Sequence, residues 1–113
     1  MKRCAWVAAA VLFSLAAEPA GAASLKKADG ALNAVYNQLI DQLSGRAEQR
    51  LRSAQRAWLA FRDAECSLQA LGAEGGSAQS AVVAQCMATL TDQRVKQLRF
   101  YLNCGEGDLA CPR

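Results

Sequence analysis

The stretch Gln55-Arg56-Ala57-Trp58-Leu59-Ala60-Phe61-Arg62-Asp63-Ala64-Glu65-Cys66 decides how this chain can fold. Trp58 and Phe61 continue an apolar stripe at helical spacing, and a cysteine closes the stretch. A second cysteine, Cys86, follows twenty residues later, with Thr91 and Arg94 beyond it. The pattern predicts two neighbouring helices that a bond between their cysteines would join.

Apolar residues recur every three or four positions in three segments, which is typical of amphipathic helices. The first predicted helix runs from about Ala28 to Leu43 and is closed by Ser44-Gly45. The second begins near Arg46 and is broken at Gly72 and the glycine-rich turn after it, and the third passes through Val82 or Val83 to Leu102. The expected buried stripes are Ala28, Leu32, Val35, Leu39 and Leu43; Ala47, Leu51, Ala54, Trp58, Phe61 and Leu68; and Cys86, Leu90, Leu98 and Leu102. With no strand alternation, we expect an all-α fold, a small antiparallel three-helix bundle stapled by disulfides.

The first residues have the pattern of an export signal. Lys2 and Arg3 supply positive charge, residues 6–17 are apolar but too short a run to span a bilayer, and residues 20–23 offer small side chains to a signal peptidase. We expect residues 1–23 to be a cleaved secretory signal peptide and residues 24–113 to form one periplasmic or secreted domain. No small-residue lipobox precedes a cysteine at the cleavage point, so we expect no stable membrane anchor.

Four cysteines remain after this cleavage: Cys66, Cys86, Cys104 and Cys111. An even number of cysteines in a short exported domain favours disulfides, because the oxidising compartment keeps them closed and a small core gains from cross-links. Zinc is the alternative, but no cysteine pair has the close spacing of a zinc site and the chain has no histidine. We therefore expect no metal and no cofactor.

Helix geometry selects among the three ways of pairing these cysteines. Cys86 and Cys104 lie ~27 Å apart along one helix, beyond the roughly 7 Å between Cα atoms that a disulfide spans. In a hairpin that turns between Gly72 and Ser77, Cys66 can face Cys86 but not Cys104. The predicted bonds are Cys66–Cys86, with part of the segment 74–79 as unwound loop, and Cys104–Cys111 in a C-terminal clasp.

The absence of histidine excludes most catalytic sites. Serine and cysteine triads need an imidazole, so only carboxylate chemistry remains. The acidic residues of the domain are scattered, and most have a basic neighbour within one helical turn, as on solvated helix faces. We expect no enzyme and keep a carboxylate-based hydrolase as a remote alternative.

Three groups of residues resemble a known family. They are Leu32-Asn33-x-x-Tyr36; Gln55-Arg56-Ala57-Trp58-x-x-Phe61-Arg62-Asp63-x-x-Cys66; and Cys86-x-x-x-x-Thr91-x-x-Arg94-x-x-x-Leu98. From about residue 29 to residue 102 the chain is similar to the lysozyme inhibitor LprI N-terminal domain family. The resemblance implies a small helical exported domain with a disulfide between the second and third helices, and the family's name implies lysozyme inhibition. The tail from Cys104 to Cys111 is an addition to this pattern.

Several residues of these groups fall on shared helix faces and suggest a polar clamp between helices: Asn33, Tyr36, Gln55, Arg62 and Arg94. An arginine beside an apolar stripe must find a carboxylate or carbonyl partner, which Asp63, Glu65 or a helix end could supply. A structural ion pair is favoured here over a binding site. Trp58 and Phe61 are expected in the core because they are in phase with the other apolar residues of their helix.

The charge of the domain helps to distinguish between two kinds of binding partner. Removing the signal takes away Lys2, Arg3 and Glu18 and leaves a net charge of two positive. Animal and egg-white lysozymes are strongly cationic, so an inhibitor of these enzymes is expected to present negative surface, and the balance argues mildly against that target. A candidate basic face suits an anionic envelope component instead, although a solvated helix face is the simpler interpretation. This face consists of Arg46, Arg50, Arg52 and Arg56. Nucleic acid is disfavoured, since no aromatic residues alternate with the arginines.

The sequence thus predicts an exported protein that works by binding. In the first hypothesis it is lysozyme-inhibitor-like and places Glu74, Gly75 and Gly76 of the turn Gly72 to Ser80 in the sugar cleft of a lysozyme. In the second it is an envelope-associated scaffold or partner-binding module that binds another envelope protein through the basic face.

Overall fold

The computed structural model describes residues 21–105 and 107–112. Most of them form three α-helices: α1 (Ala22–Gln42), α2 (Gly45–Gln69) and α3 (Gln79–Asn103), with one turn of 3₁₀ helix, η1 (Leu71–Ala73), after α2. No strand occurs within these described ranges. The expected all-α, three-helix fold is therefore confirmed. The expected signal peptide falls mainly on residues 1–20, which lie outside the described residues.

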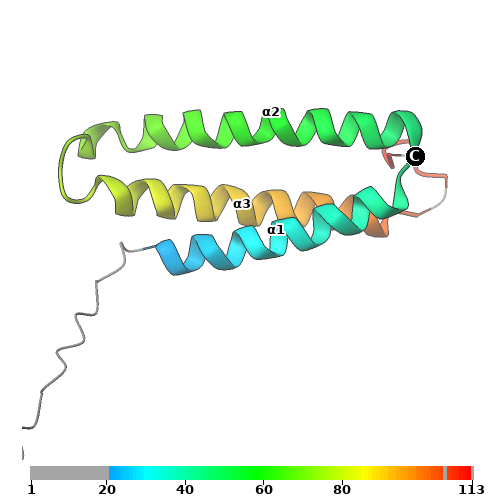
Figure 1. Cartoon of the computed structure of the whole chain (residues 1–113), viewed down its shortest axis with the longest axis horizontal. Helices are drawn as coiled ribbons and strands as arrows, with labels where there is room; N and C mark the ends of the chain where they lie inside the picture. Colours follow the sequence, from blue (N-terminus) through cyan, green and yellow to red (C-terminus); the bar gives the residue numbers. More distant parts are fainter. Residues whose placement is uncertain (1–20, 106, 113) are drawn as a thin grey trace, which may run out of the picture.

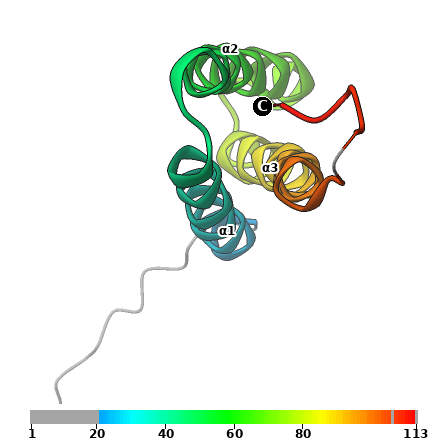
Figure 2. The same ribbon diagram turned by 90° about the vertical axis from the view of Figure 1, so that its right-hand side faces the viewer.

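The central helix of the bundle is α3. It packs against both α1 and α2, whereas α1 and α2 make little direct contact with each other. Figure 1 shows α2 and α3 as a long hairpin with α1 alongside α3, and the end-on view of Figure 2 shows the three helices around a triangular section. Any tie between α1 and α2 must therefore come from side chains.

The connection between α1 and α2 is short. Leu43 is extended, and its N–H donates to the Leu39 carbonyl at 2.9 Å, which completes the last turn of α1. Gly45 has a φ of +56°, a left-handed conformation that glycine adopts without steric cost. The predicted break at Ser44-Gly45 is confirmed. At its other end α1 begins at Ala22, earlier than the apolar stripe indicated, because the residues before Ala28 include good helix formers that need no buried partner.

The hydrophobic core lies where all three helices meet, toward the α1–α2 connection. Leu39 and Leu98 are 1% and 0% exposed, and burial of such a side chain stabilises the fold by about 1.5–3 kcal/mol. Of the expected stripe of α1, every residue is buried except Leu43, which is partly buried. The core cluster consists of Leu32, Val35, Leu39, Leu51, Val95 and Leu98.

The second helix is rotated relative to its expected stripe. Phe61 is 52% exposed and Leu68 is 65% exposed, and Ala54 also faces solvent. The prediction that these three side chains belong to the core is wrong. Trp58, in contrast, is partly buried against the core cluster, as expected.

The Cys66–Cys86 disulfide explains this rotation. Cys66 must face α3 to form the bond, and residues three or four positions apart share one side of a helix. The side of α2 that faces inward is consequently the one carrying Gln55, Trp58 and Arg62. A polar face is thereby turned toward the other helices, and the apolar side chains of Phe61 and Leu68 point outward.

Both predicted disulfides are present. The Cα atoms are 5.5 Å apart in Cys66–Cys86 and 6.0 Å apart in Cys104–Cys111, within the range of a disulfide. The segment after η1 is a turn, and α3 begins only at Gln79, which matches the unwound loop expected between the first pair. The tail folds back so that Pro112 lies beside Ser44 and Ala47 at the α1–α2 connection.

Candidate binding site

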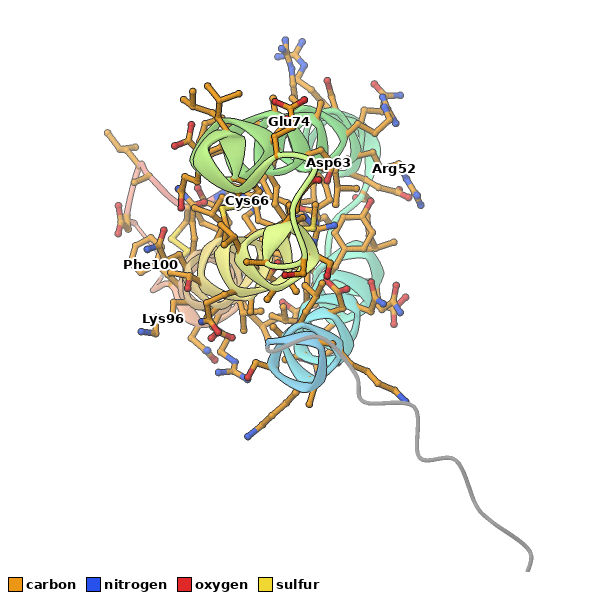
Figure 3. The ribbon with its side chains drawn as sticks, turned by 90° about the vertical axis from the view of Figure 1, so that its left-hand side faces the viewer. Arg52, Asp63, Cys66, Glu74, Lys96 and Phe100 are labelled. Carbon is orange, nitrogen blue, oxygen red and sulfur yellow. A yellow bond between two sulfur atoms is a disulfide. The ribbon has the colours of Figure 1, made fainter. Side chains whose placement is uncertain are left out.

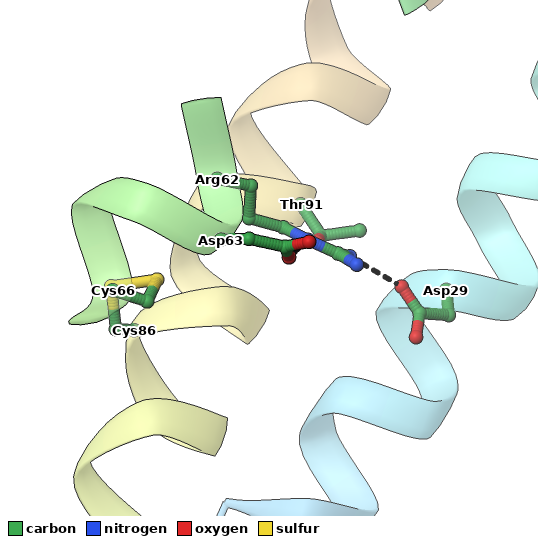
Figure 4. A network of polar contacts seen from close by, with 6 residues as sticks. All are labelled: Asp29, Arg62, Asp63, Cys66, Cys86 and Thr91. Carbon is green, nitrogen blue, oxygen red and sulfur yellow. Dashed lines mark hydrogen bonds and ion pairs between the residues drawn. A yellow bond between two sulfur atoms is a disulfide. The ribbon is translucent and has the colours of Figure 1, made fainter. Parts of the chain in front are cut away.

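The side chain of Arg62 joins all three helices. It extends from α2 with 14% of its surface exposed. Its Nη1 donates to Asp29 Oδ1 of α1 at 2.9 Å and to Thr91 Oγ1 of α3 at 3.0 Å (Figure 4). A hydrogen bond between charged groups is stronger than a neutral one. Arg62 therefore ties α1 to the α2–α3 hairpin where α1 and α2 hardly touch.

A second carboxylate lies near the same guanidinium. Asp63 Oδ1 is 3.7 Å from Arg62 Nε, and this buried nitrogen has no hydrogen-bond partner. Asp63, one of the expected partners of Arg62, forms this ion pair, whereas the hydrogen bonds of Arg62 go to Asp29 and Thr91. Sequence reasoning missed Asp29 as a partner because it lies 33 positions away on another helix.

Arg94 is buried without a carboxylate. The residue is 8% exposed. Its Nε donates to Gln55 Oε1 of α2 at 3.1 Å, and its Nη1 donates to Gln97 Oε1. Burial lowers the pKa of Arg94 from its usual value, an effect that Tyr101 opposes. No carboxylate in the described part of the chain forms an ion pair with Arg94.

The ring of Trp58 lies near both arginines. Its centroid is 5.4 Å from the Arg62 guanidinium carbon and 5.9 Å from that of Arg94. These distances allow cation–π attraction, worth about 0.5–2 kcal/mol. The indole of Trp58 is therefore an apolar group of the interior and also the cation–π partner of the two arginines.

A groove of about 420 Å³ runs between α1 and α2. Arg62 and Gln55 lie at its floor, while Asn33 is exposed and Tyr36 is partly buried on its α1 side. Neither Asn33 nor Tyr36 hydrogen bonds with Arg62 or Arg94 within the described residues. The five residues of the expected polar clamp are therefore divided: four line this groove, and Arg94 lines a different cavity.

The expected basic face is likewise divided over two sides of α2. Arg52 and Arg56 line the α1–α2 groove, whereas Arg46 and Arg50 line a cavity covered by the C-terminal tail. Positions two residues apart on a helix point in nearly opposite directions, which explains the division. Arg52 is paired with Glu48 at 2.8 Å, and this carboxylate raises the pKa of Arg52.

The expected binding loop forms the end of the α2–α3 hairpin. Glu74, Gly75 and Gly76 are all exposed, and Leu71 beside them is 62% exposed. Gly75 has a φ of +76°, which favours glycine, and its N–H donates to Gln79 Oε1 at 3.0 Å. Figure 3 looks onto this end of the bundle and shows Glu74 together with the nearby Cys66. The disulfide at the base of the loop holds its two ends together.

The acidic side chains of the site lie next to arginines. No group of three potential ligands that could hold a metal ion occurs in the described ranges. Asp29, Asp63 and Glu48 approach arginines rather than one another. The arrangement offers an exposed loop and two cavities with arginine side chains, which are features suited to binding.

The chain is thus a small helical domain with disulfide bonds, and arginine side chains in its interior form hydrogen bonds between the helices. The family model described as "Lysozyme inhibitor LprI" matches residues 14–98, so the chain belongs to the lysozyme inhibitor LprI family. The resemblance noted in the sequence is confirmed. An uncharacterized protein of Rhizobium meliloti (strain 1021) is 37% identical over 67 residues, which are 59% of this chain and 48% of that protein. The chain thus spans about half the length of the curated relative it matches. No solved structure shows a significant match.

None of the described helices has both the length and the apolar character that a membrane span requires.

Proposed function

We propose that this chain is an exported, lysozyme-inhibitor-like protein that acts by binding, with no chemistry of its own. Membership of the LprI family supports this assignment. The two disulfides fit an oxidising compartment, in agreement with a periplasmic or secreted location.

The observation that carries the proposal is the exposed, cross-linked loop between α2 and α3. Its residues contribute nothing to the core cluster, so contacts they make with a partner do not disturb the fold. The Cys66–Cys86 bond at its base limits the conformational entropy that binding would remove. Leu68 and Leu71 add exposed apolar surface beside Glu74, which suits insertion into a cleft.

The charge of the loop also supports a glycosidase partner. Glu74 is the acidic residue at its tip, and no Lys or Arg lies between Gln69 and Gln79. The loop can therefore approach a cationic enzyme although the domain as a whole is basic.

Inhibition assays with a panel of lysozymes test the proposal. The natural chain should inhibit at least one of them, and Glu74→Lys or Leu71→Asp should weaken inhibition by about tenfold or more while helicity by circular dichroism stays unchanged. Asp41→Lys is the matched control, since Asp41 is an exposed acidic residue of α1 at the far end of the bundle. Equal loss in the control, or no inhibition of any lysozyme, contradicts the proposal.

An envelope-binding module is the second candidate, and the arginines of the α1–α2 groove favour it. Arg56 is exposed and has no ion pair in the described residues. In this case Arg52→Glu and Arg56→Glu would abolish capture of the chain by envelope fractions. Added salt would weaken capture of the natural chain, whereas the loop variants would bind normally.

A further inference from the structure

A second cavity, which we name the tail cavity, lies at the opposite end of the hairpin from the loop. It has a volume of about 400 Å³. Its walls come from the end of α1, the start of α2, the end of α3 and tail residues 109–112. The Cys104–Cys111 bond constrains the tail that covers it. The family match ends at residue 98, before the tail begins.

The tail cavity carries positive charge that the described residues do not neutralise. Arg46, Arg50 and Arg94 line it, and none of its lining residues is acidic. The described residues provide no ion pair to any of the three. Arg94 is the most informative of them, because it is 8% exposed and has two neutral amides as its hydrogen-bond acceptors. A buried cation without a countercharge is unfavourable, and an anion in the cavity would relieve that cost.

The remaining wall of the tail cavity is mainly apolar. Leu39, Leu43 and Leu51 lie on the helices, and Tyr101 lies on the α3 side. Leu109 lies on the tail at the edge of the cavity and is 102% exposed, so it has no packing partner within the described chain. Apolar walls with a few convergent charged groups are typical of small-molecule sites of this size.

We propose that the tail cavity binds a small anion with a single apolar chain, of the class of medium-chain fatty acids. The carboxylate pairs with the guanidinium groups of Arg94 and Arg50, the alkyl chain lies along Leu43 and Tyr101, and Leu109 covers it. This site does not depend on the proposed lysozyme inhibition, because its lining residues come from the α1–α2 connection, the end of α3 and the tail, at the end of the bundle opposite the α2–α3 loop (Figure 1).

Calorimetric titration with three probes tests the proposal. Decanoate, kept below the concentration at which it forms micelles, has both charge and chain; decanol has the chain alone, and acetate the charge alone. We expect decanoate to bind at least about tenfold more tightly than either of the others, since each lacks one half of the interaction. Equal binding of decanoate and decanol, or no binding of decanoate, overturns the proposal.

Variants on opposite sides of α2 locate the site. Arg50→Ala should weaken decanoate binding by about tenfold, and Leu109→Asp should do the same from the tail. Both residues are exposed, so these variants should fold normally. Arg56→Ala, on the groove side of the same helix, should leave the affinity unchanged. A loss in Arg56→Ala as large as that in Arg50→Ala would show unspecific attraction to a basic protein and overturn the proposal.

Glu106 is a tail carboxylate that lies outside the described residues, so the titrations are repeated in Glu106→Gln. The same order of affinities among the three probes supports the proposal. Decanoate binding that occurs only in this variant would mean that the natural chain supplies its own anion, and would overturn it.

Discussion

Arg62 and Arg94 are two inward-facing arginines with different chemical surroundings. Arg62 has a carboxylate partner, Asp29, and a hydroxyl partner, Thr91, on the two helices it must join. Arg94 has amide partners and no ion pair in the described residues. Removing one partner of a buried ion pair is destabilising, and a buried charge that has no countercharge lowers stability. We therefore propose a structural role for Arg62 and a binding role for Arg94.

Replacing Arg62 should destabilise the domain. Arg62→Ala removes two hydrogen bonds to α1 and α3, so we expect a loss of about 2 kcal/mol and a melting temperature lower by about 5 °C or more. Thermal unfolding followed by circular dichroism measures this, with exposed Arg56→Ala as the control. A double-mutant cycle with Asp29→Asn should give a coupling energy of about 1 kcal/mol. Unchanged melting combined with loss of target binding would make Arg62 a binding residue instead.

Replacing Arg94 by an apolar side chain of similar length should have a much smaller effect. Arg94→Met keeps most of the packing and removes the cost of burying the charge, so we expect a change in unfolding free energy within about 1 kcal/mol. Urea denaturation of this variant beside Arg62→Met makes the comparison. The assignment fails if the two variants lose equal stability.

At the scale of elements, helical periodicity predicts where the helices lie along the chain, but it did not predict which side of α2 is buried. The break at Ser44-Gly45 and the break in the glycine-rich segment from Gly72 follow from local preferences and were predicted, although α2 ends slightly earlier, at Gln69. Both disulfide pairings were also predicted, because the length of α3 excludes a bond between Cys86 and Cys104. The buried side of α2 was not predicted from Phe61 and Leu68, because the disulfide, a tertiary constraint, fixes the helix with Gln55 and Arg62 inward.

The two disulfides should differ in their contribution to stability. Cys66–Cys86 closes a loop with a sequence separation of 20, and Cys104–Cys111 one of 7. The chain-entropy estimate is about 3 kcal/mol for the first and about 2 kcal/mol for the second. Replacing the first pair with Ala should also free α2 to rotate. In urea denaturation, the loss of unfolding free energy should therefore be larger for the first pair than for the second. Equal losses would show that the rotation of α2 has another cause.

At the scale of the whole molecule, the candidate binding features lie at opposite ends of the α2–α3 hairpin. The α2–α3 loop is at one end of the bundle, and the α1–α2 connection and the tail are at the other (Figure 1). The tail cavity is lined by residues of that second end, and the groove is lined by residues of α1 and α2 between the two ends. The sequence indicated the loop through its glycines, and it predicted the motif residues as a polar clamp between helices rather than as the lining of a groove. It could not indicate the tail cavity, because Arg50, Arg94 and Leu109 come together only when the tail folds back.

Export of the whole chain has a direct test in the mature N-terminus. Cleavage after Ala22 or Ala23 would leave α1 nearly complete, since α1 begins at Ala22. Mass spectrometry of the protein recovered from the periplasm or the medium should therefore find a chain starting at Ala23 or Ser24. Recovery of the uncleaved chain from the cytoplasm alone would contradict the proposed location.

Hydrogen–deuterium exchange of the chain with and without a lysozyme that it inhibits locates the binding surface on the domain. Amides in the exposed loop are held by turn hydrogen bonds rather than by a long helix, so we expect them to exchange faster than the amides of α2 and α3, and a partner cleft would shield them. If the loop is the binding surface, new protection should be centred on residues 71–79, with none at the start of α2. Protection confined to residues 46–56, with the loop unchanged, would contradict it.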